Sequence, residues 1–117
     1  MKKLYIIRHG ETEWSKSGQH TGLTDIPLLK EGIEQAKSLK KALKGISFSK
    51  VYCSPLQRVK HTCEIAGFLD NAVINSDLLE WDYGDYEGIT SHEIHKSDPT
   101  WTVFTKDPKN GETSYQI

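Results

Sequence analysis

The chain has 117 residues, with 15 basic and 16 acidic side chains and a formal net charge of −1. This length suits one domain, the charge balance excludes a strongly basic nucleic-acid surface, and no apolar run is long enough to cross a membrane. Two cysteines, Cys53 and Cys63, make no disulfide framework. We therefore expect a cytoplasmic α/β domain with a modest core, since only 36% of the residues are hydrophobic.

Short apolar runs and amphipathic segments alternate in the first half of the chain. Residues 3–7 form a β-rich run that predicts a buried strand, whereas residues 11–27, rich in Gly, Ser and Thr, predict a long loop. From Leu28 to Leu43 the apolar residues recur every three or four positions. This spacing predicts an amphipathic helix that Gly45 ends.

A second strand and helix follow. Residues 51–53 predict a strand, and Ser54 with Gln57 three residues later predicts a helix start with Ser54 as N-cap. Gly67 is expected to end this helix, and residues 73–74 predict a third strand. The order strand–helix–strand–helix–strand indicates a mostly parallel sheet covered by helices.

The remainder of the chain is more polar. Residues 80–88 are acidic, aromatic and broken by glycine, which is typical of a loop that carries chemistry. Residues 90–93 form a capping box for a short helix that Pro99 limits. Residues 113–116 indicate the N-terminus of one further helix.

Arg8 and His9 come directly after the first predicted strand. Ligands of open α/β sheets bind beyond the carboxyl ends of the strands, so these side chains lie where chemistry is expected. A guanidinium binds phosphate through two parallel hydrogen bonds, and a neutral imidazole can attack phosphorus and hold the phosphoryl group. For this pair alone, a structural histidine beside a surface arginine is the simpler interpretation.

Arg58 lies in the first turn of the predicted second helix, where the positive helix end and the guanidinium together favour an anion. An ordinary exposed arginine is the alternative. Four carboxylates of the later loop are candidates to protonate a leaving oxygen: Glu80, Asp82, Asp85 and Glu87. Their alternatives are a solvated acidic loop or a metal site made of carboxylates.

Motifs across nearly the whole chain resemble the histidine phosphatase superfamily, also called phosphoglycerate mutase-like. They are, in order, Arg8 to Trp14, Thr21 to Leu28, Cys53 to Arg58, Leu79-Glu80 with Tyr83 to Gly88, and Asn110 to Thr113. Their order and spacing make the resemblance specific. It implies a three-layer α/β/α fold with a mostly parallel sheet.

The resemblance also implies roles for individual residues. These are a phosphorylated nucleophile at His9, a proton donor at Glu80, phosphate clamps at Arg8 and Arg58, and substrate contacts at Thr21, Gly22 and Tyr83. No metal and no organic cofactor are implied. The expected partner is a small phosphorylated metabolite, not nucleic acid or a membrane, and the sequence carries no signal of an oligomeric state.

The chain departs from the family pattern at three points. Ser15 stands where many members have Asn, Leu29 stands where a Ser or Thr caps the next helix, and the second catalytic histidine is absent. In the family, the strand with that histidine lies between the strands predicted at 3–7 and 51–53. We therefore expect residues 1–117 to be the N-terminal portion of a single, truncated histidine phosphatase domain, inactive by itself.

Two features favour the phosphatases of this superfamily over its mutases. Only a short stretch separates Gly88 from Gly111, whereas the mutases carry a long insertion there. Residues 13–19 and 80–88 are similar to sedoheptulose-bisphosphatase-like members. We expect a phosphatase of small metabolites, in particular sugar phosphates, that acts through phosphohistidine. A phosphoglycerate mutase and a non-catalytic member that binds phosphorylated ligands or a partner remain open alternatives.

Overall fold

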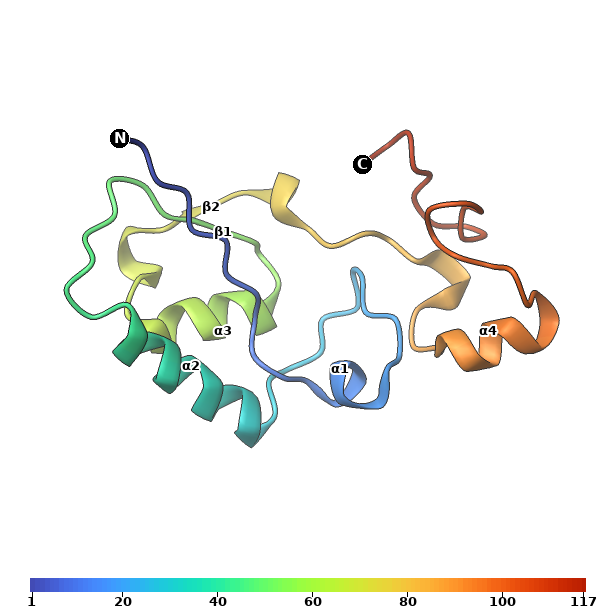
Figure 1. Cartoon of the computed structure of the whole chain (residues 1–117), viewed down its shortest axis with the longest axis horizontal. Coiled ribbons are helices and arrows are strands. Elements are labelled where there is room, and N and C mark those ends of the chain that lie inside the picture. Colours follow the sequence, from blue (N-terminus) through green and yellow to red (C-terminus); the bar gives the residue numbers. More distant parts are fainter.

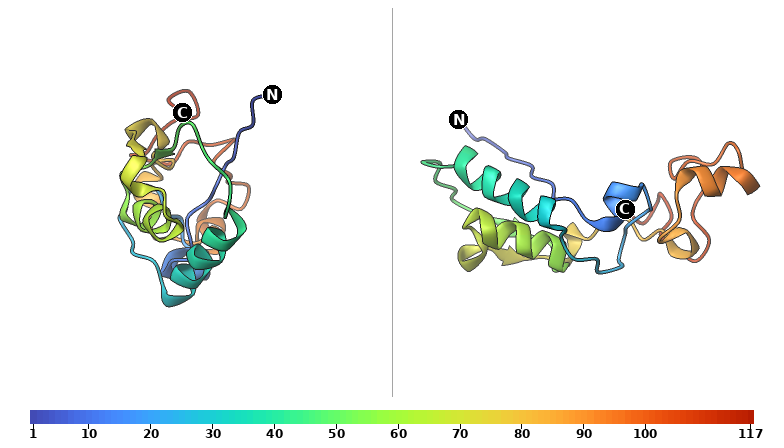
Figure 2. Two further views of the ribbon diagram at one scale, coloured as in Figure 1. Left: turned by 90° about the vertical axis from the view of Figure 1, so that its left-hand side faces the viewer. Right: turned by 90° about the horizontal axis from the view of Figure 1, so that it is seen from below.

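The computed structural model describes residues 1–117 and is elongated, with extents of 49 × 31 × 23 Å. At one end, the helices α2 (Lys30–Ala42) and α3 (Gln57–Ala66) pack against each other below two strands (Figure 1). The other end contains α4 (Ser91–Ser97) and the segments that follow it. Figure 2 shows the short helix α1 (Glu13–Ser17) between the two ends.

The sheet consists of two parallel strands, β1 (Tyr52–Cys53) and β2 (Val73–Ile74), which α3 connects. Helix α3 also contacts β1, so it covers one side of the sheet. Parallel strands joined through a helix are the βαβ arrangement, and the α/β class predicted from the sequence is confirmed. Three single turns of 3-10 helix complete the secondary structure: Leu69–Asn71, Ser76–Leu78 and Gly84–Tyr86.

The predicted buried strand at residues 3–7 is not formed. The segment belongs to neither strand, and its apolar side chains face solvent, with Leu4 85% and Ile6 88% exposed. Figure 1 shows the N-terminal segment passing the sheet without joining it. A strand needs a neighbouring backbone to bond with, and β1 pairs with β2 alone. The apolar pattern shows only that these residues suit a strand.

Residues 11–27, predicted as a loop throughout, contain the helix α1. Thr12 and Ser15 cap it reciprocally: Thr12 Oγ1 accepts a hydrogen bond from Ser15 N at 3.1 Å, and Ser15 Oγ accepts one from Thr12 N at 2.9 Å. Gly18, with φ of 81°, ends the helix in the left-handed conformation that glycine favours. The Thr-x-x-Ser spacing was the available signal for this helix.

The helix predicted from Leu28 to Leu43 is confirmed as α2. Leu29 at its N-cap makes no side-chain hydrogen bond, as its apolar side chain predicts. Gly32 lies on the buried face of α2, where a Cβ atom would overlap the backbone of Glu11. Glycine at this position therefore allows the segment after His9 to lie directly against α2.

The start of α3 differs from the prediction. The helix begins at Gln57, and Ser54 Oγ accepts only a long hydrogen bond of 3.4 Å from Leu56 N. The Gln57 N–H donates instead to the Asp25 carboxylate at 2.8 Å, and the Gln57 side-chain amide donates to the Asp25 carbonyl at 2.9 Å. Ser54 as N-cap was therefore wrong, because a carboxylate from a distant loop satisfies this helix end. The predicted end at Gly67 is confirmed.

The capping box predicted at residues 90–93 is confirmed, since Thr90 Oγ1 accepts a hydrogen bond from Glu93 N at 3.2 Å at the start of α4. Residues 113–116 form a single turn, in which the Gln116 side chain accepts a hydrogen bond from Thr113 N at 2.7 Å. A spanning helix would have to be longer and more apolar than any that the structure contains.

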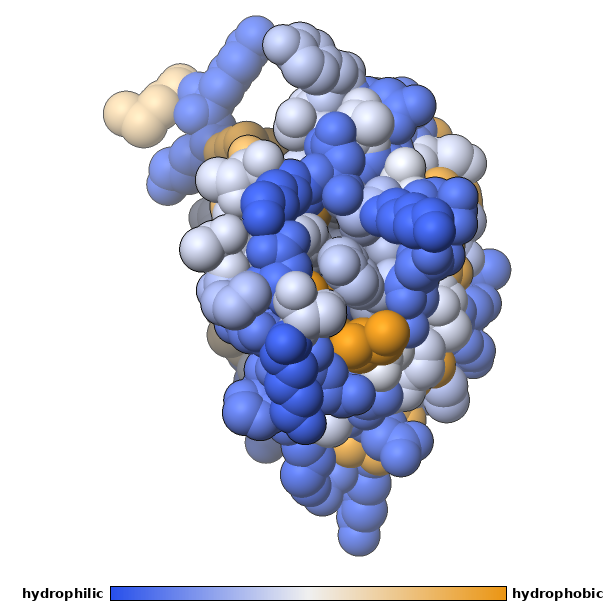
Figure 3. Space-filling model, turned by 90° about the vertical axis from the view of Figure 1, so that its right-hand side faces the viewer, coloured by the Kyte–Doolittle hydropathy of each residue, from blue (hydrophilic) through white to orange (hydrophobic).

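The buried core is small, as the hydrophobic content predicts. Only 15 of the 117 residues are buried, and four of these carry polar or charged side chains: Thr12, Ser54, Arg58 and Thr62. Figure 3 shows that the surface at the α4 end is mostly hydrophilic, with a small apolar patch near its centre. Three of the four buried polar residues belong to β1–α3 and the turn between them, so the buried polar groups concentrate in this part of the chain.

Candidate active site

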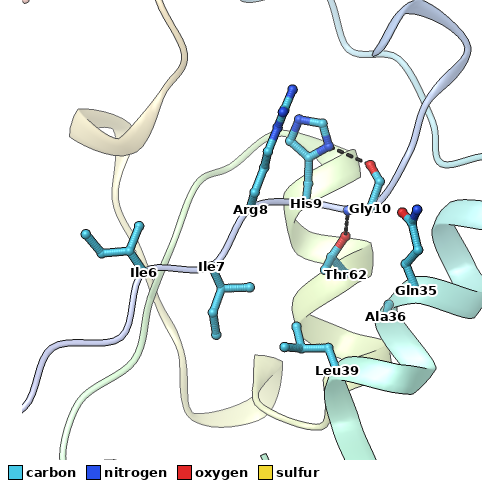
Figure 4. A pocket seen from close by; sticks show the side chains of 9 residues that line it. All are labelled: Ile6, Ile7, Arg8, His9, Gly10, Gln35, Ala36, Leu39 and Thr62. Atoms are coloured by element: carbon cyan, nitrogen blue, oxygen red, sulfur yellow. Dashed lines mark hydrogen bonds between the residues drawn. The ribbon is translucent and has the colours of Figure 1, made fainter. Parts of the chain in front are cut away.

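Arg8 and His9 lie near the end of the N-terminal segment, where it reaches α2 and α3 (Figure 4). A cavity of about 350 Å³ opens there between residues 6–10 and the two helices. The buried Gly10 N–H donates to Thr62 Oγ1 at 3.0 Å, and the Thr62 hydroxyl donates to the Arg58 carbonyl at 2.7 Å. These two bonds fix the backbone of the His9 segment to α3.

His9 is half-buried and projects to the same side of the segment as the exposed Arg8 (Figure 4). His9 Nδ1 donates to the Gly10 carbonyl at 2.7 Å, which leaves Nε2 as the ring nitrogen with a free lone pair. Burial lowers the pKa of His9, and the positive charges of Arg58 and Arg8 lower it further. The hydrogen bond to Gly10 and the charge of Glu80 raise it, but the net shift is downward. The imidazole is therefore neutral at pH 7, the form that can act as a nucleophile.

Arg58 is 1% exposed, which is exceptional for an arginine. Its Nη2 donates to the Gly22 carbonyl at 2.8 Å and more weakly to the Thr21 carbonyl at 3.5 Å, and its Nη1 donates to the Thr24 carbonyl at 3.0 Å. Nε is buried without a partner. Carbonyl oxygens do not neutralise the positive charge, so this guanidinium keeps its charge, and its Nε–H makes no hydrogen bond within the chain.

The structure distinguishes between the candidate carboxylates. Glu80 is exposed, and it is the one carboxylate whose charge raises the pKa of His9. Asp82 instead accepts a hydrogen bond at 2.9 Å from a backbone N–H of its own loop, and Asp85 accepts from a side-chain amide at 3.1 Å. Glu80 itself accepts a hydrogen bond of 3.3 Å from Trp81 N, and its charge also raises the pKa of Arg58, so charge and not a contact sets Glu80 apart from Asp82 and Asp85.

Gly22 and Thr21 lie in a loop beside Arg58. The Gly22 carbonyl accepts from Arg58, and its N–H donates to the Glu87 carboxylate at 2.7 Å. A Cβ atom at this position would overlap the carbonyl oxygen of Trp81. Gly22 is buried and Thr21 is half-buried, so the backbone of this loop supports the Arg58 side chain directly.

Tyr83 is half-buried, and its ring packs against His20 with the ring centroids 4.8 Å apart. Burial raises the pKa of Tyr83, and the negative charges of Glu80 and Glu87 raise it further. Tyr83 therefore keeps its hydroxyl proton and can donate a hydrogen bond to an oxygen of a bound molecule. The neighbouring His20 is fixed in turn, since its Nδ1 donates to the Ile89 carbonyl at 2.6 Å.

Sequence reasoning missed two residues that support this arrangement. Asp25 caps α3, and Thr62 ties Gly10 to α3. Thr62 lies four residues after Arg58, on the same helix face, and a polar pair on the buried side of a helix was the available signal. For Asp25 there was none in the local pattern. Among residues 1–117, no group of three or more His, Cys, Asp or Glu is placed to hold a metal ion.

Comparison with known proteins gives consistent results. A model of the histidine phosphatase superfamily (branch 1) matches residues 4–117. An acid phosphatase of Mycobacterium tuberculosis is 40% identical over 117 residues, which cover 98% of this chain and 57% of that protein. A sedoheptulose 1,7-bisphosphatase of Saccharomyces cerevisiae is 36% identical over 138 residues, covering 98% of this chain and 51% of that protein. A solved structure of a Mycobacterium tuberculosis protein superposes with a TM-score of 0.85 at 40% identity, covering 92% of this chain and 56% of that one.

The chain belongs to the histidine phosphatase superfamily. The resemblance seen in its motifs is thereby confirmed, together with the phosphoglycerate mutase-like α/β fold. The chain spans about half the length of the curated relatives it matches.

Proposed function

We propose that the protein is a phosphatase that hydrolyses phosphate monoesters of small metabolites, with His9 as the nucleophile. The observation that carries this proposal is the state of His9: it is half-buried, and burial and two guanidinium groups lower its pKa. Its Nδ1–H bond to the Gly10 carbonyl leaves Nε2 with a free lone pair, and Arg58, whose charge lowers the pKa of His9, has a buried Nε–H without a partner. This is the arrangement that nucleophilic attack on a bound phosphate requires.

In the proposed reaction, Arg8 and Arg58 bind the phosphate oxygens and His9 Nε2 attacks phosphorus. The bond from phosphorus to the ester oxygen breaks, and Glu80 donates a proton to that leaving oxygen. Water then attacks the phosphorus of phosphohistidine and gives a proton to the Glu80 carboxylate. The bond from phosphorus to His9 Nε2 breaks, and this step releases inorganic phosphate and restores His9. Thr21, Gly22 and Tyr83 are the proposed contacts to the rest of the substrate.

The test of this proposal is the covalent intermediate. We expect the protein expressed from its whole reading frame to form an acid-labile, base-stable phosphoryl adduct on rapid quenching with substrate, and His9→Ala to form none. His61→Ala is a matched control, because His61 is exposed on α3. An adduct that persists in His9→Ala would show that the nucleophile is another residue.

The proton donor can be tested separately. Glu80→Gln should slow esters with poor leaving groups much more than an activated aryl phosphate, which needs little protonation. Asp82→Asn should have a smaller effect, because the charge of Glu80, and not that of Asp82, acts on the pKa of His9. Uniform slowing of both substrate types by Glu80→Gln would contradict the assignment.

Sugar phosphates are the substrates we propose. The support is the similarity of residues 13–19 and 80–88 to sedoheptulose-bisphosphatase-like proteins, and the yeast relative of that name. A panel of sugar mono- and bisphosphates, with phosphoglycerates included, tests this directly. Phosphoryl transfer between phosphoglycerates in place of phosphate release would point to a mutase.

We further propose that residues 1–117 are the N-terminal portion of one histidine phosphatase domain and are inactive alone. Three observations support this: the partial coverage of both relatives, the exposed apolar residues 4–7, and a cavity that His9 lines as its one histidine. Equal turnover by residues 1–117 and by the product of the whole reading frame would contradict it.

The proposed compartment is the cytoplasm, in agreement with two unpaired cysteines, Cys53 and Cys63.

A further inference from the structure

The loop of residues 21–24 lies between two opposite charges. On one side, the Glu87 carboxylate accepts three hydrogen bonds: from Gly22 N at 2.7 Å, from Thr24 N at 3.0 Å and from Thr24 Oγ1 at 3.1 Å. On the other side, the carbonyls of the same loop accept from the Arg58 guanidinium. No other side chain of residues 80–88 makes a hydrogen bond to this loop. Glu87 therefore accepts from its N–H and hydroxyl groups, while Arg58 donates to its carbonyls.

The geometry of one peptide unit shows how the two charges are linked. The carbonyl of Thr21 faces Arg58 at 3.5 Å, while the N–H of the same peptide, that of Gly22, donates to Glu87 at 2.7 Å. The negative end of the peptide dipole therefore points at the cation and the positive end at the anion. Hydrogen bonds with an ionised partner are roughly twice as strong as neutral ones, so both charges hold this peptide in one orientation.

Close packing adds to this constraint. A Cβ atom on Gly22 would lie 3.0 and 3.1 Å from the two Glu87 carboxylate oxygens, and it would overlap the Trp81 carbonyl. The loop thus has little room to move without breaking its bonds to Glu87. Arg58 is 1% exposed, and its terminal nitrogens bond only to this loop, so its guanidinium lies where the loop places it.

We propose that Glu87 is a positioning residue for Arg58: through the 21–24 loop, its carboxylate fixes the guanidinium in the orientation that binds the phosphate group. The inference rests on the proposed function for its consequence in catalysis. Glu87 does not donate the proton in this scheme, because both of its oxygens already accept hydrogen bonds from the loop. Its negative charge also raises the pKa of Arg58, against the lowering that burial causes.

The test is a double-mutant cycle on the binding of inorganic phosphate, measured by calorimetry on the protein expressed from its whole reading frame. Glu87→Gln keeps the shape and removes the charge, and its amide cannot accept from both Gly22 and Thr24 in the same way. We expect about tenfold weaker binding, and less than about twofold further loss when Glu87→Gln is added to Arg58→Ala. Losses that are independent and multiply would overturn the proposal, because a residue acting through Arg58 has nothing to position once Arg58 is gone.

Glu34→Gln is the matched control. It makes the same change of charge on an exposed side chain of α2, whose only ion pair is with Lys37, and it should leave phosphate binding within about twofold of the original protein. If Glu87→Gln does not fold, Glu87→Asp keeps the charge and shortens the side chain. This variant should unfold cooperatively and bind phosphate about threefold more weakly, and unchanged binding would overturn the inference.

Hydrolysis measured on the same proteins separates this inference from the proposed function. Phosphate binding that shows the expected coupling, without hydrolysis of any ester, would overturn the function and support the role of Glu87. Hydrolysis with independent losses would support the function and overturn the role of Glu87. Failure of the original protein to bind inorganic phosphate at millimolar concentration would overturn both.

Discussion

Arg8 and Arg58 of the candidate site each follow a short apolar segment in the sequence, yet their surroundings in the structure differ completely. Arg58 follows β1, is 1% exposed and donates to carbonyls of the 21–24 loop. Arg8 is exposed, and so is the segment before it, with Ile6 88% exposed. The comparison teaches that an apolar run specifies the ability to form a strand, and that burial depends on a neighbouring backbone.

The difference has a simple origin in the chain connections. β1 meets β2 because α3 returns the chain to the same side, and the three elements bury one another. Residues 4–7 have no such neighbour, and the first tie of their segment to α3 is the Gly10 N–H bond to Thr62. Order at His9 therefore comes from the helix side of the site, through Gly10 and Thr62.

The largest effect should follow from removing the side chain of Arg58, the buried one of the two arginines. We expect Arg58→Ala to reduce kcat/KM about 30- to 1000-fold, equivalent to about 2–4 kcal/mol, because in the proposed reaction the guanidinium binds charge that develops in the transition state. Lys60→Ala, two residues further along α3, should have little effect, since Lys60 is exposed and residues two apart do not share a helix face. Steady-state kinetics on the protein expressed from its whole reading frame measures both variants, and similar losses would contradict the assignment.

The same comparison explains which features the sequence could predict. Local signals were sufficient for α2, for α4 with its Thr90 cap, and for the end of α3 at Gly67. The Thr12-x-x-Ser15 signal for α1 was equally local and was overlooked. These features depend on residues within four positions of one another, so periodicity and capping patterns report them.

The features that sequence reasoning got wrong or missed depend on distant residues. Asp25, and not Ser54, accepts the hydrogen bond from the first N–H of α3, and it lies 32 positions from Gln57. The carboxylate of Glu87 accepts its hydrogen bonds from a loop 63 to 65 positions earlier in the chain. The motifs located Arg8, His9, Arg58 and Glu80, but only the folded chain shows which carboxylate raises the pKa of His9 and which carbonyls accept from Arg58.

An intermediate effect should follow from removing the hydrogen bond that links the His9 segment to α3. Thr62→Val keeps the shape of the side chain but leaves the buried Gly10 N–H without its acceptor, which should lower the free energy of unfolding by about 1–3 kcal/mol. Urea denaturation measures this change. Thr105→Val is the control, because Thr105 is exposed, and it should change the free energy by less than about 0.5 kcal/mol. Equal changes in the two variants would show that the segment is held in another way.

The smallest effect concerns the charge around His9, and its sign distinguishes the neighbours. Burial lowers the pKa of His9 below 6.5, Arg8 lowers it further, and Glu80 raises it. Arg8→Gln should therefore raise the pKa of His9, and Glu80→Gln should lower it, as followed by NMR titration of the imidazole. Since the unfolded chain binds this proton more tightly, the His9 contribution to stability is lost as the pH falls through 6.5 toward the lower folded pKa. Shifts of the same sign in both variants would mean that the charges of Arg8 and Glu80 do not act on His9 as the structure indicates, and that Arg8 plays no part in keeping the His9 imidazole neutral.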